Sequence, residues 1–100
     1  MSTATLDPAT ERVIEIQAAR DAKLAIVLLG RHPAWIVDEQ VSLAQNECVF
    51  DVVFRYDRCW VRRRYTYDAE VDVLHMRGEM PFDEAQLHTL PRAALVQVPA

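Results

Sequence analysis

The N-terminal part of the chain mixes charged and apolar residues between a helix-start signal and a helix-stop signal. Asp7 followed by Pro8 is typical of a helix start, because the Asp carboxylate accepts from free backbone N–H groups and Pro needs no partner at the first helical position. The pattern predicts a helix that runs to Leu29, where Gly30 can take the left-handed conformation and Pro33 prevents continuation. Such a helix has about 22 residues and is about 33 Å long.

The end of this predicted helix, LAIVLL over Leu24–Leu29, is apolar on every side, and one helix face cannot bury all of it. Three arrangements fit the pattern: the helix end lies deep in the fold, it packs against a second copy of the chain, or the segment is a buried strand. Periodicity does not separate them. The excess apolar surface favours self-association, and we predict a dimer interface that includes Leu24, Val27 and Leu28.

After Pro33 the hydrophobic period changes to two, which is typical of half-buried strands. The first predicted strand has an apolar face formed by Trp35, Val37, Val41 and Leu43. A turn at residues 45–47 leads to a second strand, one face of which carries Cys48, Phe50, Val52, Phe54 and Tyr56.

The pair Asp57-Arg58 interrupts the second strand and predicts the tip of a hairpin. Residues equally distant from the tip then lie opposite one another. The predicted pairs are Phe54 with Val61, Phe50 with Tyr65, Asp51 with Arg64, and Arg55 with Trp60. A register chosen only by the turn thus yields apolar pairs on one face, and an ion pair and a cation–π pair on the other, which supports the hairpin.

A second turn at Asp68–Glu70 leads into VDVLHMRG and predicts a fourth strand, which completes an antiparallel meander. The facing of this strand depends on the loop, because a slip of one residue reverses every side chain. A three-residue loop puts Val73 and His75 on the core face, whereas a four-residue loop puts Leu74 and Met76 there.

Asp83 and Gln86 form a capping box, which predicts a short helix over about residues 84–90. The run RAALVQVPA that follows Pro91 has no cap and no turn signal, so it is a frayed tail or an added edge strand, and we favour the tail. We therefore expect one α+β domain over residues 1–90 and a C-terminal tail over residues 91–100. The domain is a two-layer sandwich, in which a long N-terminal helix packs on a four-stranded antiparallel β-meander and a short C-terminal helix follows.

Composition agrees with one folded domain: the chain has 100 residues, of which 51% are hydrophobic and 26% charged. Because the net charge is −4, binding to nucleic acid would need a local basic patch. The longest apolar run is too short to span a bilayer, and the first residues lack the basic start of a secretion signal. We therefore expect a cytoplasmic protein without membrane association, in which Cys48 and Cys59 stay reduced and serve packing.

The sequence has none of the short motifs of P-loop, dinucleotide-binding, zinc-protease or serine-hydrolase sites. With glycine only at positions 30 and 78, a glycine-rich phosphate loop cannot form. None of the three histidines has a second ligand at metal spacing, and neither cysteine meets a base in the predicted register. The sequence therefore identifies no catalytic residue, no metal ligand and no cofactor.

Arginine and tryptophan residues gather on the predicted third strand and its neighbours. The group consists of Arg55, Arg58, Trp60, Arg62, Arg64 and Arg77. Because the helix should cover the opposite face, Trp60, Arg62 and Arg64 point outward and suit an acidic protein surface, phosphates or stacked bases. We predict a partner-binding site formed by Arg55, Trp60, Arg62 and Arg64. Charge reversal at Arg62 and Arg64 is then expected to abolish partner capture and to leave the fold intact.

These features favour a small non-enzymatic binding or assembly protein that forms a homodimer and binds a protein partner through its Arg and Trp sheet face. One alternative is a small acid–base enzyme or ligand carrier with a pocket between helix and sheet, for which His75 with Asp72 or Tyr65 are the candidate groups. A second alternative is a nucleic-acid-binding protein, whose affinity would fall steeply with salt.

The run YDAEVDVLHM over Tyr67–Met76 resembles the strand–turn–strand phrase Y-D-x-E-x-D-x-L-Y-I of some small bacterial domains. His75 stands where an aromatic residue is usual. The resemblance implies a hairpin turn followed by an alternating strand, and it carries no function over to this chain.

Overall fold

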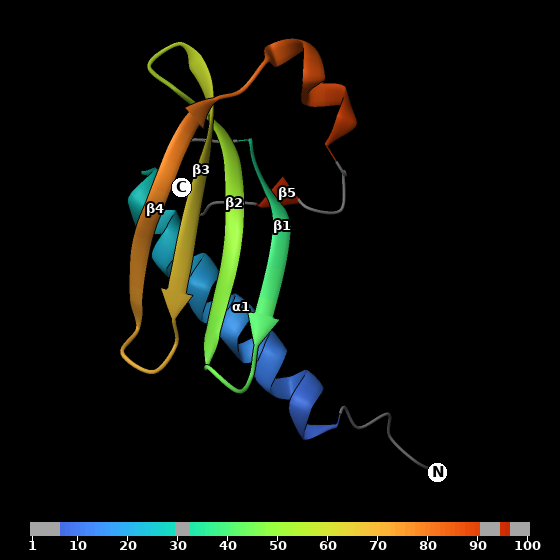
Figure 1. Cartoon of the computed structure of the whole chain (residues 1–100), viewed down its shortest axis with the longest axis vertical. Helices are drawn as coiled ribbons and strands as arrows, with labels where there is room; N and C mark the ends of the chain where they lie inside the picture. The colour runs from blue at the N-terminus through green and yellow to red at the C-terminus, as the bar shows by residue number, and fades with distance from the viewer. Residues whose placement is uncertain (1–6, 30–32, 91–94, 97–100) are drawn as a thin grey trace.

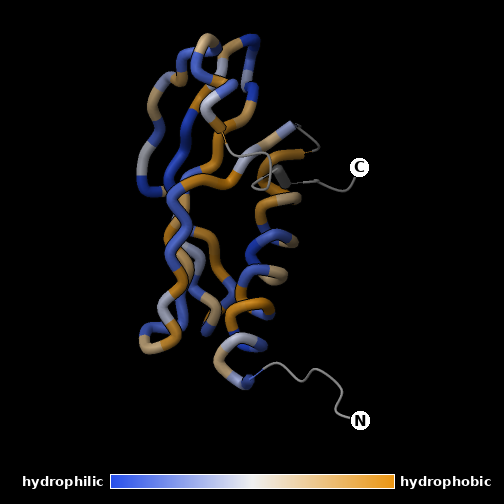
Figure 2. The backbone as a smooth tube through the Cα atoms, turned by 90° about the vertical axis from the view of Figure 1, so that its right-hand side faces the viewer, coloured by the Kyte–Doolittle hydropathy of each residue, from blue (hydrophilic) through white to orange (hydrophobic). Residues whose placement is uncertain are grey.

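The computed structural model describes residues 7–29, 33–90 and 95–96 of the chain, which form a helix layer and a sheet layer (Figure 1). The elements in chain order are α1 (Pro8–Leu28), β1 (Ala34–Ser42), β2 (Glu47–Tyr56), β3 (Cys59–Asp68), β4 (Val73–Pro81), the 3₁₀ helix η1 (Glu84–Thr89) and β5 (Leu95–Val96). The strands lie in the order β4-β3-β2-β1-β5, and all pairings are antiparallel. Helix α1 crosses one face of the sheet (Figures 1 and 2). The predicted two-layer α+β fold is confirmed.

The two ends of α1 follow from local hydrogen bonding. Asp7 caps the start, since its carboxylate accepts from the Thr10 backbone N–H at 3.0 Å, and Pro8 is the first helical residue. At the other end Leu29 is left-handed, with φ 52°, and its N–H donates to the carbonyl of Ala25. Gly30, to which the sequence assigned this conformation, lies outside the described residues. In the described ranges, no helix is both long and apolar enough to cross a membrane.

The segment Leu24–Leu29 belongs to the helix up to Leu28, so the strand alternative is wrong. Leu24 and Leu28 face the sheet and are fully buried within the chain itself, beside Ile16. Among the three residues predicted for a dimer interface, Val27 alone keeps substantial exposure, at 39%. The first arrangement, a helix end that packs into the fold, therefore describes Leu24 and Leu28.

The hairpin of β2 and β3 has the predicted register at every pair from Glu47–Asp68 to Tyr56–Cys59. Asp57 and Arg58 form its tip with φ values of 50° and 70°, the two positive values of a type I′ turn, whose twist matches that of the strands. On the helix side Phe50 and Tyr65 stack with ring centroids 5.7 Å apart. This ladder forms the centre of the core.

The facing predicted for the first half of β1 is wrong. The register shifts between Val37 and Gln40, a bulge at which Asp38 has φ 53°. Ala34 and Ile36 are buried toward the helix before the bulge, whereas Trp35 and Val37 point to the other face. A bulge inserts one residue and reverses the alternation, so a single strict period across the whole strand assigned this half to the wrong face.

In β4 the structure selects one of the two predicted loops. Four residues separate β3 from β4, so that Leu74 lies opposite Tyr67 and Met76 opposite Tyr65 on the helix side. His75 lies opposite Thr66 and points to the other face. At the C-terminus, Leu95–Val96 pair with β1 as an edge strand, so the tail that we favoured is wrong for these two residues.

The burial of α1 predicts a large difference between two leucines of the same segment. Leu24→Ala should lower the free energy of unfolding by about 2–5 kcal/mol, because it leaves a cavity in the core. Leu29→Ala, at a side chain 75% exposed, should change it by less than about 0.5 kcal/mol. Urea unfolding of dilute protein, followed by tryptophan fluorescence, measures both; equal losses would contradict the helix facing.

Candidate partner-binding face

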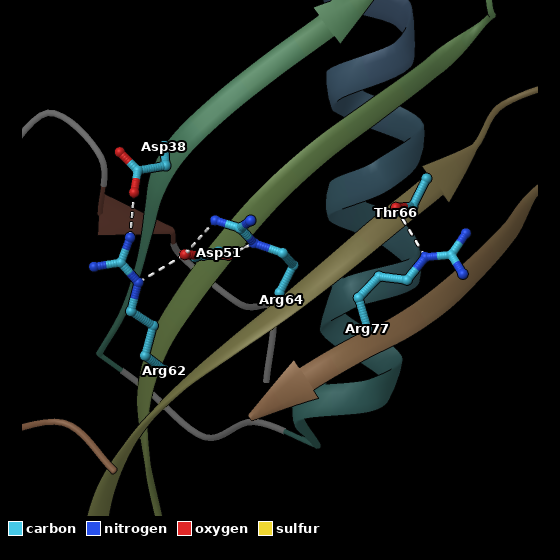
Figure 3. Close-up of polar contacts among 6 residues, drawn as sticks. All are labelled: Asp38, Asp51, Arg62, Arg64, Thr66 and Arg77. Atoms are coloured by element: carbon cyan, nitrogen blue, oxygen red, sulfur yellow. Dashed lines mark hydrogen bonds and ion pairs between the residues drawn. The ribbon is translucent and has the colours of Figure 1, made fainter. Parts of the chain in front are cut away.

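The sheet face that points away from α1 is called the outer face below. Strand alternation places on it Trp35 and Val37 of β1, Val49, Asp51, Val53 and Arg55 of β2, Trp60, Arg62, Arg64 and Thr66 of β3, and His75, Arg77 and Met80 of β4. Figure 3 shows its polar centre, with α1 behind the strands. All four residues predicted for partner binding, Arg55, Trp60, Arg62 and Arg64, lie on this face.

The carboxylate of Asp51 lies at the centre of the outer face and binds two of these arginines (Figure 3). Its Oδ1 accepts from Nε of Arg64 at 2.7 Å, and its Oδ2 accepts from Nε of Arg62 at 2.7 Å. The Asp51 side chain is only 5% exposed. Desolvation opposes its ionisation, but the hydrogen bonds and charges of Arg64 and Arg62 hold the pKa of Asp51 below its ordinary value.

The bulge in β1 supplies a second carboxylate to this group. Asp38 takes a left-handed conformation there and forms an ion pair with Arg62 on the outer face. Its neighbour Glu39 turns to the helix side, where it accepts from Gln17 at 2.8 Å and pairs with Arg20. Asp38 could not be assigned to this group from the sequence, because unbroken alternation does not place it beside Arg62 and the β1 sequence has no glycine that would signal a bulge.

The arginines of the outer face differ in their exposure and in the ion pairs and hydrogen bonds that they form within the chain. Arg62 is held by two carboxylates and is 28% exposed, whereas Arg64 is held by Asp51 and is 54% exposed. Arg77 donates from Nε to the Thr66 hydroxyl at 3.2 Å. Arg55 is exposed and has no ion pair within the described ranges.

The two tryptophans pack against each other instead of under an arginine. Arg55 lies opposite Trp60 in the ladder, as predicted, but the Trp60 ring meets Trp35, with centroids 5.8 Å apart and planes inclined by 50°. Val53 lies on the same face and is fully buried. The outer face therefore combines an apolar cluster of Trp35, Val53 and Trp60 with the guanidinium groups beside it.

On the helix side of the sheet, the charged side chain of Arg20 is packed into the core. Arg20 is 4% exposed; its guanidinium lies 4.9 Å from the centroid of Phe50, and Nη1 donates to Sγ of Cys48 at 3.3 Å. Burial raises the pKa of the Cys48 thiol to about 11, despite the nearby Arg20 charge. A thiol held in this form is a poor nucleophile, which agrees with a packing role.

The structure does not assemble the acid–base candidates into one site. His75 lies exposed on the outer face, whereas Tyr65 is buried on the helix side, where its hydroxyl accepts from Nη1 of Arg63 at 2.8 Å. Asp72 accepts from the Tyr67 hydroxyl and forms an ion pair with Lys23 of α1 at 3.2 Å. The described part of the chain contains no cluster of three or more His, Cys, Asp or Glu that could hold a metal ion.

The two cysteines should differ sharply in reactivity. In native protein at about pH 8, Ellman's reagent should titrate the exposed Cys59, while Cys48 should react only after unfolding, because it is buried and its thiolate is scarce. The variant Cys59→Ser should then show no thiol until guanidinium is added. Rapid labelling of native Cys59→Ser would show that Cys48 is more accessible than its burial indicates.

The ion pairs of Asp51 predict a specific loss of stability. Asp51→Asn should lower the free energy of unfolding at pH 7 by about 2–3 kcal/mol, less than for a deeply buried pair because Arg64 is half exposed. Asp38→Asn, at a carboxylate 64% exposed, should cost less than about 1 kcal/mol.

At low pH, the difference in the free energy of unfolding between wild type and Asp51→Asn should become smaller. The pKa of Asp51 is lowered in the folded state, so its stabilisation is complete above the unfolded value of about 3.9 and is lost as the pH falls below it. Urea titrations at about pH 7 and pH 3 measure this. Equal stability of the Asp51 and Asp38 variants at neutral pH would contradict a central role for Asp51.

The same contacts limit what mutations at the predicted arginines can test. Replacing both Arg62 and Arg64 with acidic residues would leave the buried Asp51 carboxylate without a cation, which is costly. The expectation that this double reversal leaves the fold intact therefore has no support in the structure. Arg55 and Arg77 lie on the same face and do not pair with Asp51, so their charge can be reversed without leaving that carboxylate unpaired.

Comparison with known proteins adds no relative: no family model, no curated protein and no solved structure matches this chain.

Proposed function

We propose that this chain is a small non-enzymatic binding or assembly protein of the cytoplasm, which acts as a homodimer and uses its outer face to bind an acidic protein partner. The observation that carries the proposal is the charge of this face. Four guanidinium groups, those of Arg55, Arg62, Arg64 and Arg77, lie on it, and the carboxylates of Asp38 and Asp51 pair with only two of them, Arg62 and Arg64.

The two guanidinium groups that are not paired with a carboxylate lie in different parts of the outer face. Arg55 lies next to the hairpin tip, and Arg77 lies near the middle of β4. The acidic pair Glu47 and Asp68 closes the opposite end of the β2–β3 ladder. Although the whole chain has a net charge of −4, an acidic surface that approaches the hairpin half of the outer face meets net positive charge.

The apolar part of the face supports a protein as the partner. Tryptophan and arginine are the residues most enriched among those that carry protein–protein binding energy. Trp35 and Trp60 pack against each other over the sheet, which keeps their rings ordered before any partner arrives. Bases of a nucleic acid would have to stack on rings that are already engaged with one another, so an acidic protein segment fits better.

An acidic peptide tests the proposal directly. A fluorescein-labelled peptide of glutamate and leucine should bind wild-type protein, and the double variant Arg55→Glu, Arg77→Glu should weaken it about tenfold, since each exposed charge contact contributes about 0.5–1 kcal/mol. Fluorescence anisotropy at low and high salt gives the dissociation constants.

The matched control is Arg12→Glu, Lys23→Glu, which makes the same change of net charge on α1, away from the outer face. It should bind the acidic peptide within about twofold of wild type. An equal loss in both double variants would mean that overall charge alone drives binding. If labelled oligo(dT) binds more tightly than the peptide and loses affinity steeply with salt, nucleic acid is the better partner class and the proposal fails.

A further inference from the structure

Strand β4 lies at one edge of the sheet, where it pairs with β3 on one side only (Figure 1). All of its residues except Leu74 are exposed. In the part of the chain that the structure describes, no strand pairs with its other side. Such an edge presents a row of unpaired backbone N–H and C=O groups, to which another strand can be added.

The ladder between β3 and β4 shows which backbone groups are unpaired. In an antiparallel ladder, alternate residues direct their N–H and C=O groups to one neighbour, and the residues between them direct theirs to the other side. Directly after β4, the Phe82 N–H donates to the carbonyl of Trp60 at 2.8 Å. The β3 residues in phase with Trp60 lie opposite Val73, His75, Gly78 and Met80. The residues between these, Leu74, Met76 and Glu79, therefore direct their backbone groups away from β3. The term open edge refers to these groups.

Two features limit the length of the open edge. Pro81 is in phase with Glu79, so its backbone nitrogen faces away from β3, where the missing N–H is tolerated. The register shift leaves Arg77 as an extra residue, and such a bulge interrupts regular pairing. The uninterrupted stretch of the edge is therefore Val73–Met76, with Arg77 at its end.

The side chains along this stretch differ between the two faces of the sheet. Toward the helix they are apolar: Leu74 is half-buried and Met76 is 58% exposed. Toward the outer face they include His75 and, at the bulge, Arg77, and neither forms an ion pair within the described ranges. A strand added here would place its side chains alternately beside apolar and beside basic residues.

We infer that the open edge of β4 binds an extended segment of the acidic partner as an added antiparallel strand, in which acidic residues alternate with apolar ones. The inference rests on the partner binding proposed above and gives its mode. The acidic side chains lie opposite His75 and Arg77 on the outer face, and the apolar ones opposite Leu74 and Met76 on the helix side. Antiparallel addition continues the pairing of the whole sheet and is slightly more favourable per residue than parallel addition.

A second copy of β4 fits the same edge less well. Pairing two β4 strands would bring two Arg77 side chains onto one edge of the outer face, and like charges on adjacent strands are destabilising. The carboxylate of β4 does not compensate, because Glu79 lies on the helix side and pairs with Arg63 at 2.7 Å. Charge therefore selects an acidic segment over a second copy of the chain.

N-methylated peptides test strand addition by fluorescence anisotropy. The probe is the fluorescein-labelled peptide Glu-Leu-Glu-Leu-Glu-Leu-Glu. In the antiparallel arrangement, its leucine N–H groups donate to β4 and its glutamate N–H groups face solvent. N-methylation of the leucines should raise the Kd at least tenfold, and N-methylation of the glutamates between them should leave it within about threefold. Equal Kd values for the two methylated peptides, or the reverse order, would overturn the arrangement.

Two pairs of variants locate the peptide on β4. Met76→Pro removes one N–H of the open edge, whereas Met76→Ala shortens the same side chain and keeps the N–H. Met76→Pro should raise the Kd at least fivefold relative to Met76→Ala.

The second pair does not depend on the folding of a proline variant. Arg77→Glu should raise the Kd more than Arg55→Glu, because Arg55 lies on β2, two strands away from this edge. Circular dichroism confirms that both variants keep the fold. Equal effects would place the peptide over the middle of the sheet and would overturn binding at the edge.

The outcomes separate this inference from the proposal on which it rests. An unmethylated peptide that does not bind overturns both. Binding that is weakened by Arg55→Glu, Arg77→Glu but is insensitive to N-methylation keeps the acidic partner on the outer face and overturns strand addition. Sedimentation velocity of the protein alone tests the other occupant: self-association that Met76→Pro abolishes would mean that a second copy of the chain fills the open edge.

Discussion

The unbroken ladder between β2 and β3 is the constraint on which the other parts of the structure depend. Ten consecutive pairs, from Glu47–Asp68 to Tyr56–Cys59, join the two strands in one register. Because side chains alternate, this register sends Phe50 and Tyr65 toward α1 and Asp51 and Arg64 to the outer face. A slip of one residue would bury the charges and expose the rings, so the core and the outer face depend on the same turn.

Asp51 connects stability with the character of the outer face. A carboxylate that is almost fully buried needs cations, and Arg62 and Arg64 supply them from the neighbouring strand. These two arginines therefore stabilise the sheet face, and the carboxylates of Asp51 and Asp38 partly neutralise their charge. Arg55 and Arg77, in contrast, form no ion pair with a carboxylate of the outer face.

Two irregular positions shape the sheet around the regular ladder. The bulge in β1 turns Asp38 toward Arg62 and Glu39 toward Arg20, so one inserted residue supplies carboxylates to both sides of the sheet. In β4 the register shifts opposite Arg64 and Tyr65, which leaves Arg77 as the extra residue and directs it to Thr66. Bulges of this kind re-aim side chains at the cost of regular pairing.

The sequence by itself determined the features that depend on neighbouring residues: the Asp7 cap of α1, the tip and register of the β2–β3 hairpin, and the presence of Arg62 and Arg64 on the face away from the helix. Only the tertiary structure decided the facing of Trp35, the pairing of Asp38, and the addition of β5 to the edge of β1. It also divided Leu24–Leu29 into a buried and an exposed side. The reason is that caps and tight turns are set by local hydrogen bonds, whereas a bulge or a helix face is chosen by burial against residues far away in the chain.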